Sequence, residues 1–377
     1  MVNTERLCKE FLRQASIASP PFQEGEMADY LAERFRAFSN SIEFDDTASR
    51  LNGESGNLLI KIPGTRPGEP LLLSVHMDTV TPCLGVEPIL VDGVFRSAGE
   101  TVLGADDKAG ITEIIETLEI VREQGIDHPP LEILITVCEE VGLLGAKHFD
   151  CDRLESKRGI ALDTNGTGKL IYRAPGANKF RITITGLEAH AGMAPEKGVS
   201  AIETAARAIS RMRLGRIDEE TTANIGLIEG GQASNIVPRQ VVLAGEVRSH
   251  DGEKLQMQTD HILHSLEAAA REMTKVIDGK TIKPVITTEV TADYPIMHVK
   301  KDAPVIQLIS AAATTLGQPL KVSMAGGGSD ANIFNDSGIE TVILSSGMEN
   351  VHTSEESVSV ADLTKVTELL VEVIRTA

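Results

Sequence analysis

The chain has 377 residues, of which 41% are apolar, 24% are charged and 3% are aromatic, and its formal net charge at pH 7 is −19. This length exceeds what one compact core usually holds, so two domains are expected. The excess of acid and the absence of tryptophan argue against basic stripes for phosphate and against base-stacking platforms. We therefore expect no nucleic-acid partner.

The cysteines and the hydropathy pattern indicate a cytoplasmic protein without a membrane partner. The four cysteines have no CxxC spacing, which is typical of reduced residues in the cytosol. The first residues, MVNTERLCKEFLRQ, contain no apolar region of a signal peptide. No run reaches the roughly 18 apolar residues that a membrane-spanning helix needs.

Strands and helices alternate through the first half of the chain. The spacing of Leu7, Phe11, Leu12 and Ala15 predicts a helix, with Thr4 as its cap. The next predicted elements are a helix over 24–38, strands over 57–62 and 71–75, a helix from 110, and strands over 131–137 and 159–162. This alternation predicts a mostly parallel sheet with helices on both faces.

The pattern changes near Lys179, where apolar and polar residues begin to alternate as they do in a half-solvated strand. The predicted elements are then a strand over 180–185, a helix over 199–212, strands over 223–228 and 241–247, a helix over 253–276 and a strand over 285–290. This β-α-β-β-α-β order is that of a ferredoxin-like domain.

After Pro295 the first pattern resumes, with a helix over 303–316, a strand over 341–344 and a final amphipathic helix. The predicted fold class is therefore α/β. Residues 1–175 and 292–377 form a larger domain, and an α+β domain of residues 176–291 is inserted into it.

Acidic side chains and a histidine follow several predicted strands directly. His76 follows LLLSV, Glu139 and Glu140 follow LEILITVC, and Asp163 follows GIAL. Ligands of an open α/β sheet bind beyond the carboxyl ends of its strands. A single acid there is more often a helix cap. Several together are costly to bury unless a cation neutralises them, so they indicate a site for two hard or borderline metal ions.

Alternatives remain open for individual members of this set. Asp78 lies on the same side of the strand as His76 and can accept a hydrogen bond from its ring, either beside a metal or as a purely structural pair. Asp106, with its acidic neighbour in GADDKAG, opens a helix, where the dipole alone favours acids. The Glu139–Glu140 pair is repulsive unless one carboxylate binds metal and the other acts as a base.

Five segments together resemble the M20 family of dinuclear metallopeptidases, and its peptidase-T-like members most closely. The segments are GADDKAG, CEEVGLLGA, the HMDT that begins at His76, the AHAG that contains His190, and the GGGSD that begins at Gly326. They occur in the family's order along nearly the whole chain. The resemblance implies a zinc-exopeptidase catalytic domain with an inserted ferredoxin-like lid and dimerisation domain.

The resemblance also implies a set of metal ligands. Asp106 would bridge two divalent ions, which would be zinc in this family. Mixed nitrogen and oxygen ligands suit cobalt and manganese as well. His76 and Asp163 would complete one site, and Glu140 and His352 would complete the other.

Catalytic roles are implied in the same way. Glu139 would be the general base for attack by a water held between the metals, and Asp78 would orient His76. A cis peptide would follow Asp106. His190 would reach the active site of the partner subunit in a homodimer and help to bind the developing oxyanion.

Substrate contacts are expected from two further segments. Asn235 and Arg248 match family positions that contact substrate, and Arg248 offers a fork for a terminal carboxylate. For Arg248 the alternative is a surface salt bridge. Gly326, Gly327, Gly328 and Ser329 would receive a carboxylate or backbone of the substrate, or else form a simple turn.

The expected activity is release of the N-terminal residue from short peptides, tripeptides first. The same machinery would serve a carboxypeptidase or an N-acyl-amino-acid deacylase, because pocket walls rather than the metal ligands decide the substrate. A non-enzymatic metal-binding protein is the third hypothesis. The retention of Glu139 and of every expected ligand argues against it.

Overall fold

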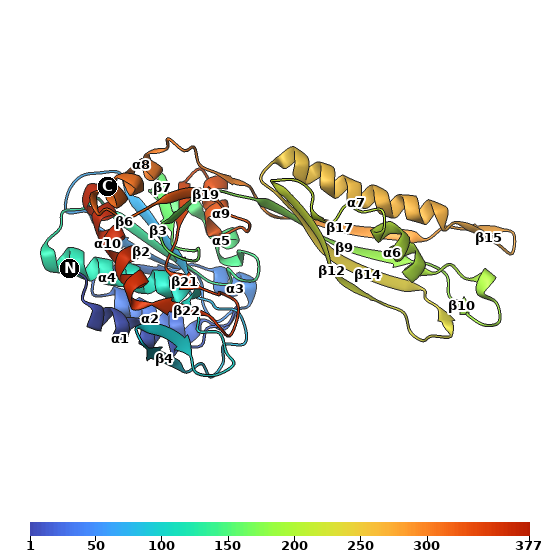
Figure 1. Ribbon diagram of the computed structural model, residues 1–377, viewed down its shortest axis with the longest axis horizontal. Coiled ribbons are helices and arrows are strands. Elements are labelled where there is room, and N and C mark those ends of the chain that lie inside the picture. Colours follow the sequence, from blue (N-terminus) through green and yellow to red (C-terminus); the bar gives the residue numbers. More distant parts are fainter. The chain divides into compact units, whose positions relative to one another are not determined.

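The computed structural model describes all residues, 1–377. Its contacts divide the chain into two compact units, each with its own core (Figure 1). Unit 1 comprises residues 1–174 and 297–377, and unit 2 comprises residues 175–296. None of the helices combines the length and the apolar character that crossing a membrane requires.

Unit 1 is built on a nine-stranded sheet that is parallel at its centre. In spatial order its strands are β1 (Ser41–Phe44), β2 (Leu58–Ile62), β6 (Leu131–Thr136), β3 (Leu71–His76), β7 (Arg158–Ala161), β20 (Glu340–Leu344), β8 (Lys169–Ala174) and β18 (Met297–His298), with β19 (Lys321–Met324) also paired to β8. The pairs among β6, β3, β7 and β20 are parallel. These four strands therefore end at the same edge of the sheet.

Helices cover both faces of this sheet because alternate strand residues point to opposite sides. On β3, Leu71, Leu73 and Val75 share a core with α2 (Gly25–Phe35), α4 (Ala105–Gln124), α8 (Pro304–Thr315) and α10 (Val360–Thr376). Leu72 packs instead with α5 (Leu144–His148) and α9 (Asp330–Asp336). The mixed α/β fold with a mostly parallel central sheet is confirmed.

A second, four-stranded antiparallel sheet lies in unit 1. Its order is β21 (Met348–Glu349), β22 (Ser357–Ser359), β5 (Val94–Ser97) and β4 (Pro88–Val91). Phe95 of β5 packs against Phe11 of α1 (Thr4–Ala15), with 4.6 Å between the ring centroids. The loop between β21 and β22 carries His352. The remaining short helices are α3 (Thr47–Leu51) and the 3-10 turns η1 (Cys151–Arg153) and, in unit 2, η2 (Pro195–Lys197).

Unit 2 has the expected ferredoxin-like order. It runs β9 (Gly176–Thr185), α6 (Ala201–Ile209), β12 (Thr221–Gly230), β14 (Gln240–Ser249), α7 (Gly252–Glu272) and β17 (Val285–Tyr294), and the antiparallel sheet order is β11 (Gly215–Arg216), β12, β14, β9 and β17. Ile182 and Ile184 of β9 pack with Ala205 of α6 and Leu266 of α7. Figure 1 shows α7 running along the sheet. Two small ladders, β10 (Ala189–His190) with β13 (Ile236–Val237) and β15 (Lys275–Ile277) with β16 (Lys280–Ile282), complete the unit.

Element boundaries differ from expectation where local turn chemistry decides them. Asn3, not Thr4, caps α1, because its Oδ1 accepts the Arg6 N–H at 3.1 Å. The helix predicted over 253–276 ends at Glu272. Asp278 and Gly279 take φ of 47° and 77°, as a tight hairpin requires, and they join β15 to β16. The helix predicted over 24–38 occupies only Gly25–Phe35, and strand β8 was not predicted.

Candidate active site

The sheet topology brings the predicted ligands to one edge of unit 1. His76 is the last residue of β3, Glu139 and Glu140 follow β6, and Asp163 follows β7. Asp106 lies in the first turn of α4, which begins beyond the same edge. His352 comes from the distant loop between β21 and β22.

The Asp106 carboxylate is the centre of this cluster, because its two oxygens face two different imidazoles. Oδ1 lies 3.0 Å from His76 Nε2, and Oδ2 lies 3.3 Å from His352 Nε2. His352 Nε2 is also 3.0 Å from Glu140 Oε1. The ligand atoms of His76, Asp106 and Glu140 all lie within 4.8 Å of one another, which suits a metal ion.

The His76 ring contacts both the main-chain carbonyl and the carboxylate of Asp78, and the carbonyl is the nearer of the two. Its Nδ1 lies 3.0 Å from the carbonyl oxygen of Asp78, whereas the Asp78 carboxylate is 3.5 Å away. A carbonyl oxygen only accepts, so Nδ1 carries a proton and Nε2 is the atom left to bind a metal. Asp78 thus fixes the tautomer of His76 mainly through its backbone.

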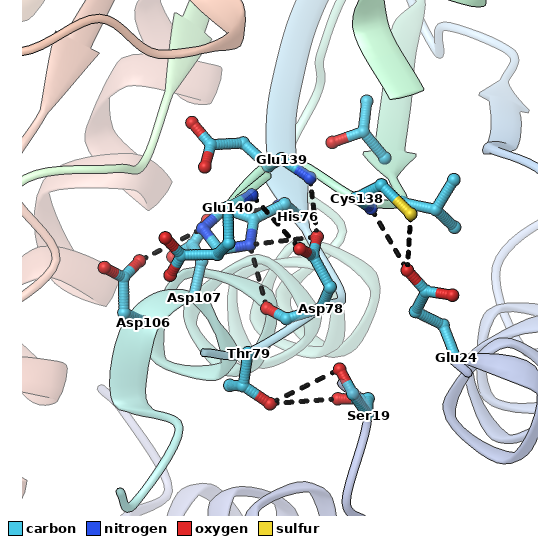
Figure 2. A network of polar contacts seen from close by, with 12 residues as sticks. Ser19, Glu24, His76, Asp78, Thr79, Asp106, Asp107, Cys138, Glu139 and Glu140 are labelled. Carbon is cyan, nitrogen blue, oxygen red and sulfur yellow. Dashed lines mark hydrogen bonds and ion pairs between the residues drawn. The ribbon is translucent and has the colours of Figure 1, made fainter. Parts of the chain in front are cut away.

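The carboxylate of Asp78 has another task, which the sequence did not indicate. It is fully buried, and it accepts the N–H groups of Glu139 at 2.9 Å and of Glu140 at 3.1 Å. Figure 2 shows the Glu139 carboxylate directed away from Asp78. Asp78 therefore fixes the backbone from which the base and one ligand project.

Glu24 extends this arrangement by one residue. Its buried Oε1 accepts both the N–H of Cys138, at 3.1 Å, and the S–H of Cys138, at 3.2 Å (Figure 2). Cys138 has a φ of 52°, in the left-handed region that non-glycine residues seldom adopt. Two buried carboxylates thus hold three consecutive N–H groups, those of Cys138, Glu139 and Glu140.

Burial and mutual repulsion govern the charges of the cluster. Burial, together with the Asp163 carboxylate, raises the pKa of Glu139, and burial with Asp106 raises the pKa of Asp163. Burial would also raise the pKa of Asp106, but hydrogen bonds from His352 and His76 hold it low. Hydrogen bonds to Asp106 and Glu140 raise the pKa of His352 to about 10. Without a cation, protons therefore neutralise this site.

The nitrogen and oxygen atoms of this cluster also fit divalent cations, which would neutralise the buried carboxylates as protons do. Imidazole nitrogens and carboxylate oxygens together suit zinc, cobalt or manganese. A dication would replace the protons that His352 and the buried carboxyls otherwise keep. Asp163 lies outside the group whose ligand atoms are within 4.8 Å, so its link to the cluster in this structure is electrostatic.

The turn that presents Asp106 is tightly packed. The peptide bond between Asp106 and Asp107 is cis, as the family resemblance implied. Asp107 is buried and accepts the N–H of His76 at 3.4 Å and that of Gly110 at 3.3 Å. A Cβ at residue 110 would lie 2.5 Å from Asp107 Oδ1 and 2.8 Å from Leu162 Cβ, so only glycine fits there.

Comparison with known proteins identifies the family. The sequence pattern of the peptidase dimerisation domain M20_dimer matches residues 172–274, and that of peptidase family M28 matches residues 57–181. The crystal structure of aminopeptidase PepT from Bacillus cereus is 40% identical, covers 100% of this chain and 99% of that chain, and has a TM-score of 0.91. The chain belongs to the M20 family of peptidases, close to peptidase T.

Two further relatives agree with this placement. A tripeptidase from Staphylococcus aureus is 37% identical, with 100% of this chain and 98% of that chain covered and a TM-score of 0.94. Protein YqjE of Bacillus subtilis, which is described as uncharacterised, is 39% identical over the full length of both chains. The M20 dimerisation pattern begins just before unit 2 and ends shortly after α7.

In this M20 peptidase, His190 and Asn235 lie next to each other in unit 2. His190 pairs with Ile236 in the β10–β13 ladder, and the Asn235 carbonyl accepts the Ala191 N–H at 2.9 Å. The exposed His190 ring accepts two backbone N–H groups at Nδ1, from residues 192 and 193, at 3.2 and 3.1 Å. Its proton is therefore on Nε2, which faces outward as a donor.

Arg248 lies in the five-stranded sheet of unit 2, at the end remote from the β10–β13 ladder that carries His190. It pairs with Ala177 at the start of β9, whereas His190 comes after the end of β9 at Thr185. At about 3.3 Å per residue, Ala177 and Thr185 of β9 are roughly 26 Å apart. The Arg248 fork holds Glu246, with 2.8 Å from Nε to Oε1 and 3.1 Å from Nη2 to Oε2.

The glycine-rich loop between β19 and α9 behaves differently from expectation at its last residue. Ser329 is buried and caps α9, because its Oγ accepts the Ala331 N–H at 3.2 Å and its N–H donates to Asn332 Oδ1 at 3.0 Å. Its Oγ therefore serves the helix as an acceptor, while the O–H of the same group can still donate. Gly326 is exposed, and Gly327 and Gly328 are half-buried, so backbone is what these three glycines can offer a substrate.

Sequence reasoning missed three buried acids, Glu24, Asp330 and Glu356. Asp330 accepts the hydroxyl of Thr136 at 2.5 Å, and Thr136 is the strand neighbour of His76. Burial raises the pKa of Asp330 to about 6. Each of the three binds a hydroxyl or backbone groups near the site. In the sequence, Asp330 was marked only as the last residue of the GGGSD segment and Glu356 only by its nearness to His352, and nothing marked Glu24.

We predict that Glu24→Gln has little effect on kcat, whereas Glu24→Ala lowers it strongly. Only Oε1 has partners, while Oε2 is buried without one. Glu24→Gln should therefore keep the hydrogen bonds and stay within about twofold of wild-type kcat, whereas Glu24→Ala should lower kcat about ten- to a hundredfold by displacing Glu139. Steady-state kinetics at saturating metal measure both. Equal damage from both variants would show that the Cys138 contacts do not position the base.

The metal-free protein should lose stability as the pH rises above the ordinary carboxyl pKa of 4.5. Folded Glu139 and Asp163 retain protons that the unfolded chain has released, so their contribution to stability is present at low pH and is lost as the pH rises through their raised pKa values. Thermal unfolding between pH 5 and pH 8, with and without zinc, tests this. The difference in Tm between the two forms should widen with pH, and a constant or narrowing difference would contradict the account.

Proposed function

We propose that this M20 peptidase is a metal-dependent aminopeptidase that releases the N-terminal residue of short peptides, tripeptides first. The observation that carries the proposal is the Asp106 carboxylate, whose two oxygens face His76 and His352 separately. Similarity over the full chain to an aminopeptidase PepT and to a tripeptidase supports the substrate class.

Two divalent cations, with zinc as the first choice, would occupy this cluster. Asp106 would lie between them, with His76 and Asp163 on one side and His352 and Glu140 on the other. When bound, they would polarise the scissile carbonyl and acidify a water molecule.

Glu139 is the group that would move the proton. It is nearly buried, and its backbone is fixed by Asp78, so its carboxylate has a defined direction. In the metal-free protein, burial and the Asp163 carboxylate raise the pKa of Glu139 above its ordinary value, which favours its acceptance of a proton. It would take a proton from the attacking water and return it to the leaving amine nitrogen.

Groups of unit 2 and the glycine loop would hold the substrate. Arg248 would exchange the carboxylate of Glu246 for that of the peptide, which makes the same two-pronged contact. Asn235 and the backbone of Gly326 to Gly328 would add polar contacts. His190 would donate from Nε2 to the oxyanion of the tetrahedral intermediate.

The positions of His190 and Arg248 support a homodimer as part of this proposal. Because Arg248 lies beside the start of β9 and His190 follows its end, one copy of unit 2 would not bring both to the same short peptide. The open edge of β12 suits the dimer contact. Beyond its short pairing with β11 it exposes Leu227 and Ile228, at 59% and 57%, and Ile202 of α6 reaches toward Gly231 at its end.

Peptide hydrolysis tests the proposed activity. Di-, tri- and tetrapeptides, each with a free or an acetylated N-terminus, are incubated with the zinc, cobalt or manganese form, and the products are identified by mass. We expect the N-terminal residue to be released from unblocked tripeptides fastest, and acetylation to abolish cleavage. Release of the C-terminal residue, or activity that requires the acyl group, would instead identify a carboxypeptidase or a deacylase.

Mixing two inactive variants tests whether His190 acts across the dimer. Glu139→Gln should lose about 10²- to 10⁴-fold in kcat while still binding metal, and His190→Ala should also be impaired. A heterodimer of the two has one site with both groups intact, so an equal mixture should regain about a quarter of wild-type activity in a symmetric dimer. Glu355→Gln, on the exposed loop beside His352, is the control and should be fully active.

Absence of any recovery, after subunit exchange has been verified by mass spectrometry, would place His190 in its own chain's site or outside catalysis.

A further inference from the structure

The carboxylate of Glu356 joins two distant segments of the candidate site. It is almost completely buried, and each oxygen accepts one backbone N–H. Oε1 accepts that of Asp106 at 3.0 Å, and Oε2 accepts that of Gly104 at 2.7 Å. A side chain near the end of the chain thus binds the backbone of the residue that faces both imidazoles.

The first turn of α4 receives no side-chain cap from Gly104, and regular helix begins only after Asp106 and Asp107, whose backbone angles are not helical. The first N–H groups of a helix have no partner within it, and a Ser, Thr, Asp or Asn side chain usually accepts one of them. Here the cap residue is Gly104, with a φ of 76°. A Cβ at that position would lie 2.7 Å from Thr79 Cγ2, so no side chain can be placed there. Glu356 supplies the missing acceptor.

Glu356 and His352 belong to the same short loop. The loop is closed at its base by the pairing of β21 with β22, and the Glu356 N–H donates to the Thr353 carbonyl at 3.1 Å. The loop therefore touches the Asp106 turn twice, through Glu356 to its backbone and through His352 to its carboxylate. These two contacts fix the separation of Asp106 from His352.

Glu356 adds a buried carboxylate beside the negative charge of Asp106, and the buried ammonium group of Lys108 offsets part of that repulsion. The two hydrogen bonds of Glu356 define the position of the Asp106 backbone relative to the loop that carries His352.

We infer that Glu356 is a positioning residue that sets Asp106 and His352 at the spacing required by the cation between Asp106, His352 and Glu140. The inference rests on the proposed two-cation function. Glu356 touches neither substrate nor metal in this scheme and acts through the Asp106 backbone.

Because both carboxylate oxygens of Glu356 accept a backbone N–H, a glutamine at this position cannot replace it fully. A glutamine at 356 keeps one acceptor and turns its NH₂ group toward the other N–H, so Glu356→Gln removes one of the two contacts. Glu132 provides the matched control. It is also buried and also accepts backbone N–H groups, from Glu155 at 3.0 Å and from Ser156 at 2.9 Å, but it lies on β6 away from the ligand-bearing strand ends.

Cobalt titration of the metal-free protein, followed by visible absorption and calorimetry, measures the two cation affinities directly. Wild type should bind two ions. Glu356→Gln should bind the first with wild-type affinity and the second about ten- to a hundredfold more weakly, as loss of a partner behind a ligand typically does. Glu132→Gln should lower Tm and leave both affinities unchanged.

Wild-type affinity for both ions in Glu356→Gln, with only a lower Tm, would overturn the inference and leave Glu356 a helix cap. Should this variant not fold, Glu356→Asp keeps the charge but shortens the reach, and the same loss at the second ion is expected. Because the readout is metal affinity, a wild type that binds two ions and cleaves no peptide would refute the proposed activity without touching this inference.

Discussion

The shared carboxylate of Asp106 is the contact on which the rest of the site depends. One oxygen faces an imidazole at the end of β3, and the other faces an imidazole on a loop far along the chain. The two imidazoles must both be positioned closely for the single carboxylate of Asp106 to face each of them with one oxygen. Glu356 binds the backbone N–H of this residue directly, and the close packing at Gly110 holds its neighbour Asp107.

Buried acids have two separate tasks in this protein, and burial alone does not distinguish them. One set, Asp106, Glu139, Glu140 and Asp163, presents negative charge to a common space and is neutralised there by protons or cations. The other set, Glu24, Asp78 and Glu356, accepts backbone N–H groups and thereby aims the first set. Such bonds to charged acceptors are stronger than neutral ones, which suits them to holding turns with left-handed or uncapped residues.

The sequence revealed the first set and largely missed the second. Acids at the ends of apolar strands stand out because they are costly to bury, and the parallel order of β6, β3 and β7 follows from the alternation of strands and helices. Contacts to backbone N–H groups leave no such pattern, because any acid in a loop can make them once tertiary structure brings it near. Glu24 and Glu356 could therefore not be told from solvated acids such as Glu355. Asp78 was recognised, but through its side chain, whereas its carbonyl holds His76.

The same limit applies to the fold and to substrate contacts. Long periodic segments such as α4, α7 and β9 were predicted, while β8 and the small sheet that carries His352 were not, because short strands depend on pairing with distant partners. Arg248 holds Glu246 in this structure, so the ion-pair alternative is realised while a carboxylate-binding role remains proposed. Ser329 belongs to the loop expected to receive substrate, and its side chain also caps α9, which the sequence analysis did not predict.

The central claim is that Asp106 lies between two cations. X-ray diffraction from crystals of the zinc-loaded protein, measured on both sides of the zinc absorption edge, locates each ion by its anomalous signal. The account predicts two peaks about 3.5–4 Å apart, one bound by Asp106 with His76 and Asp163, the other by Asp106 with His352 and Glu140. A single peak, or two peaks of which only one contacts Asp106, would contradict it.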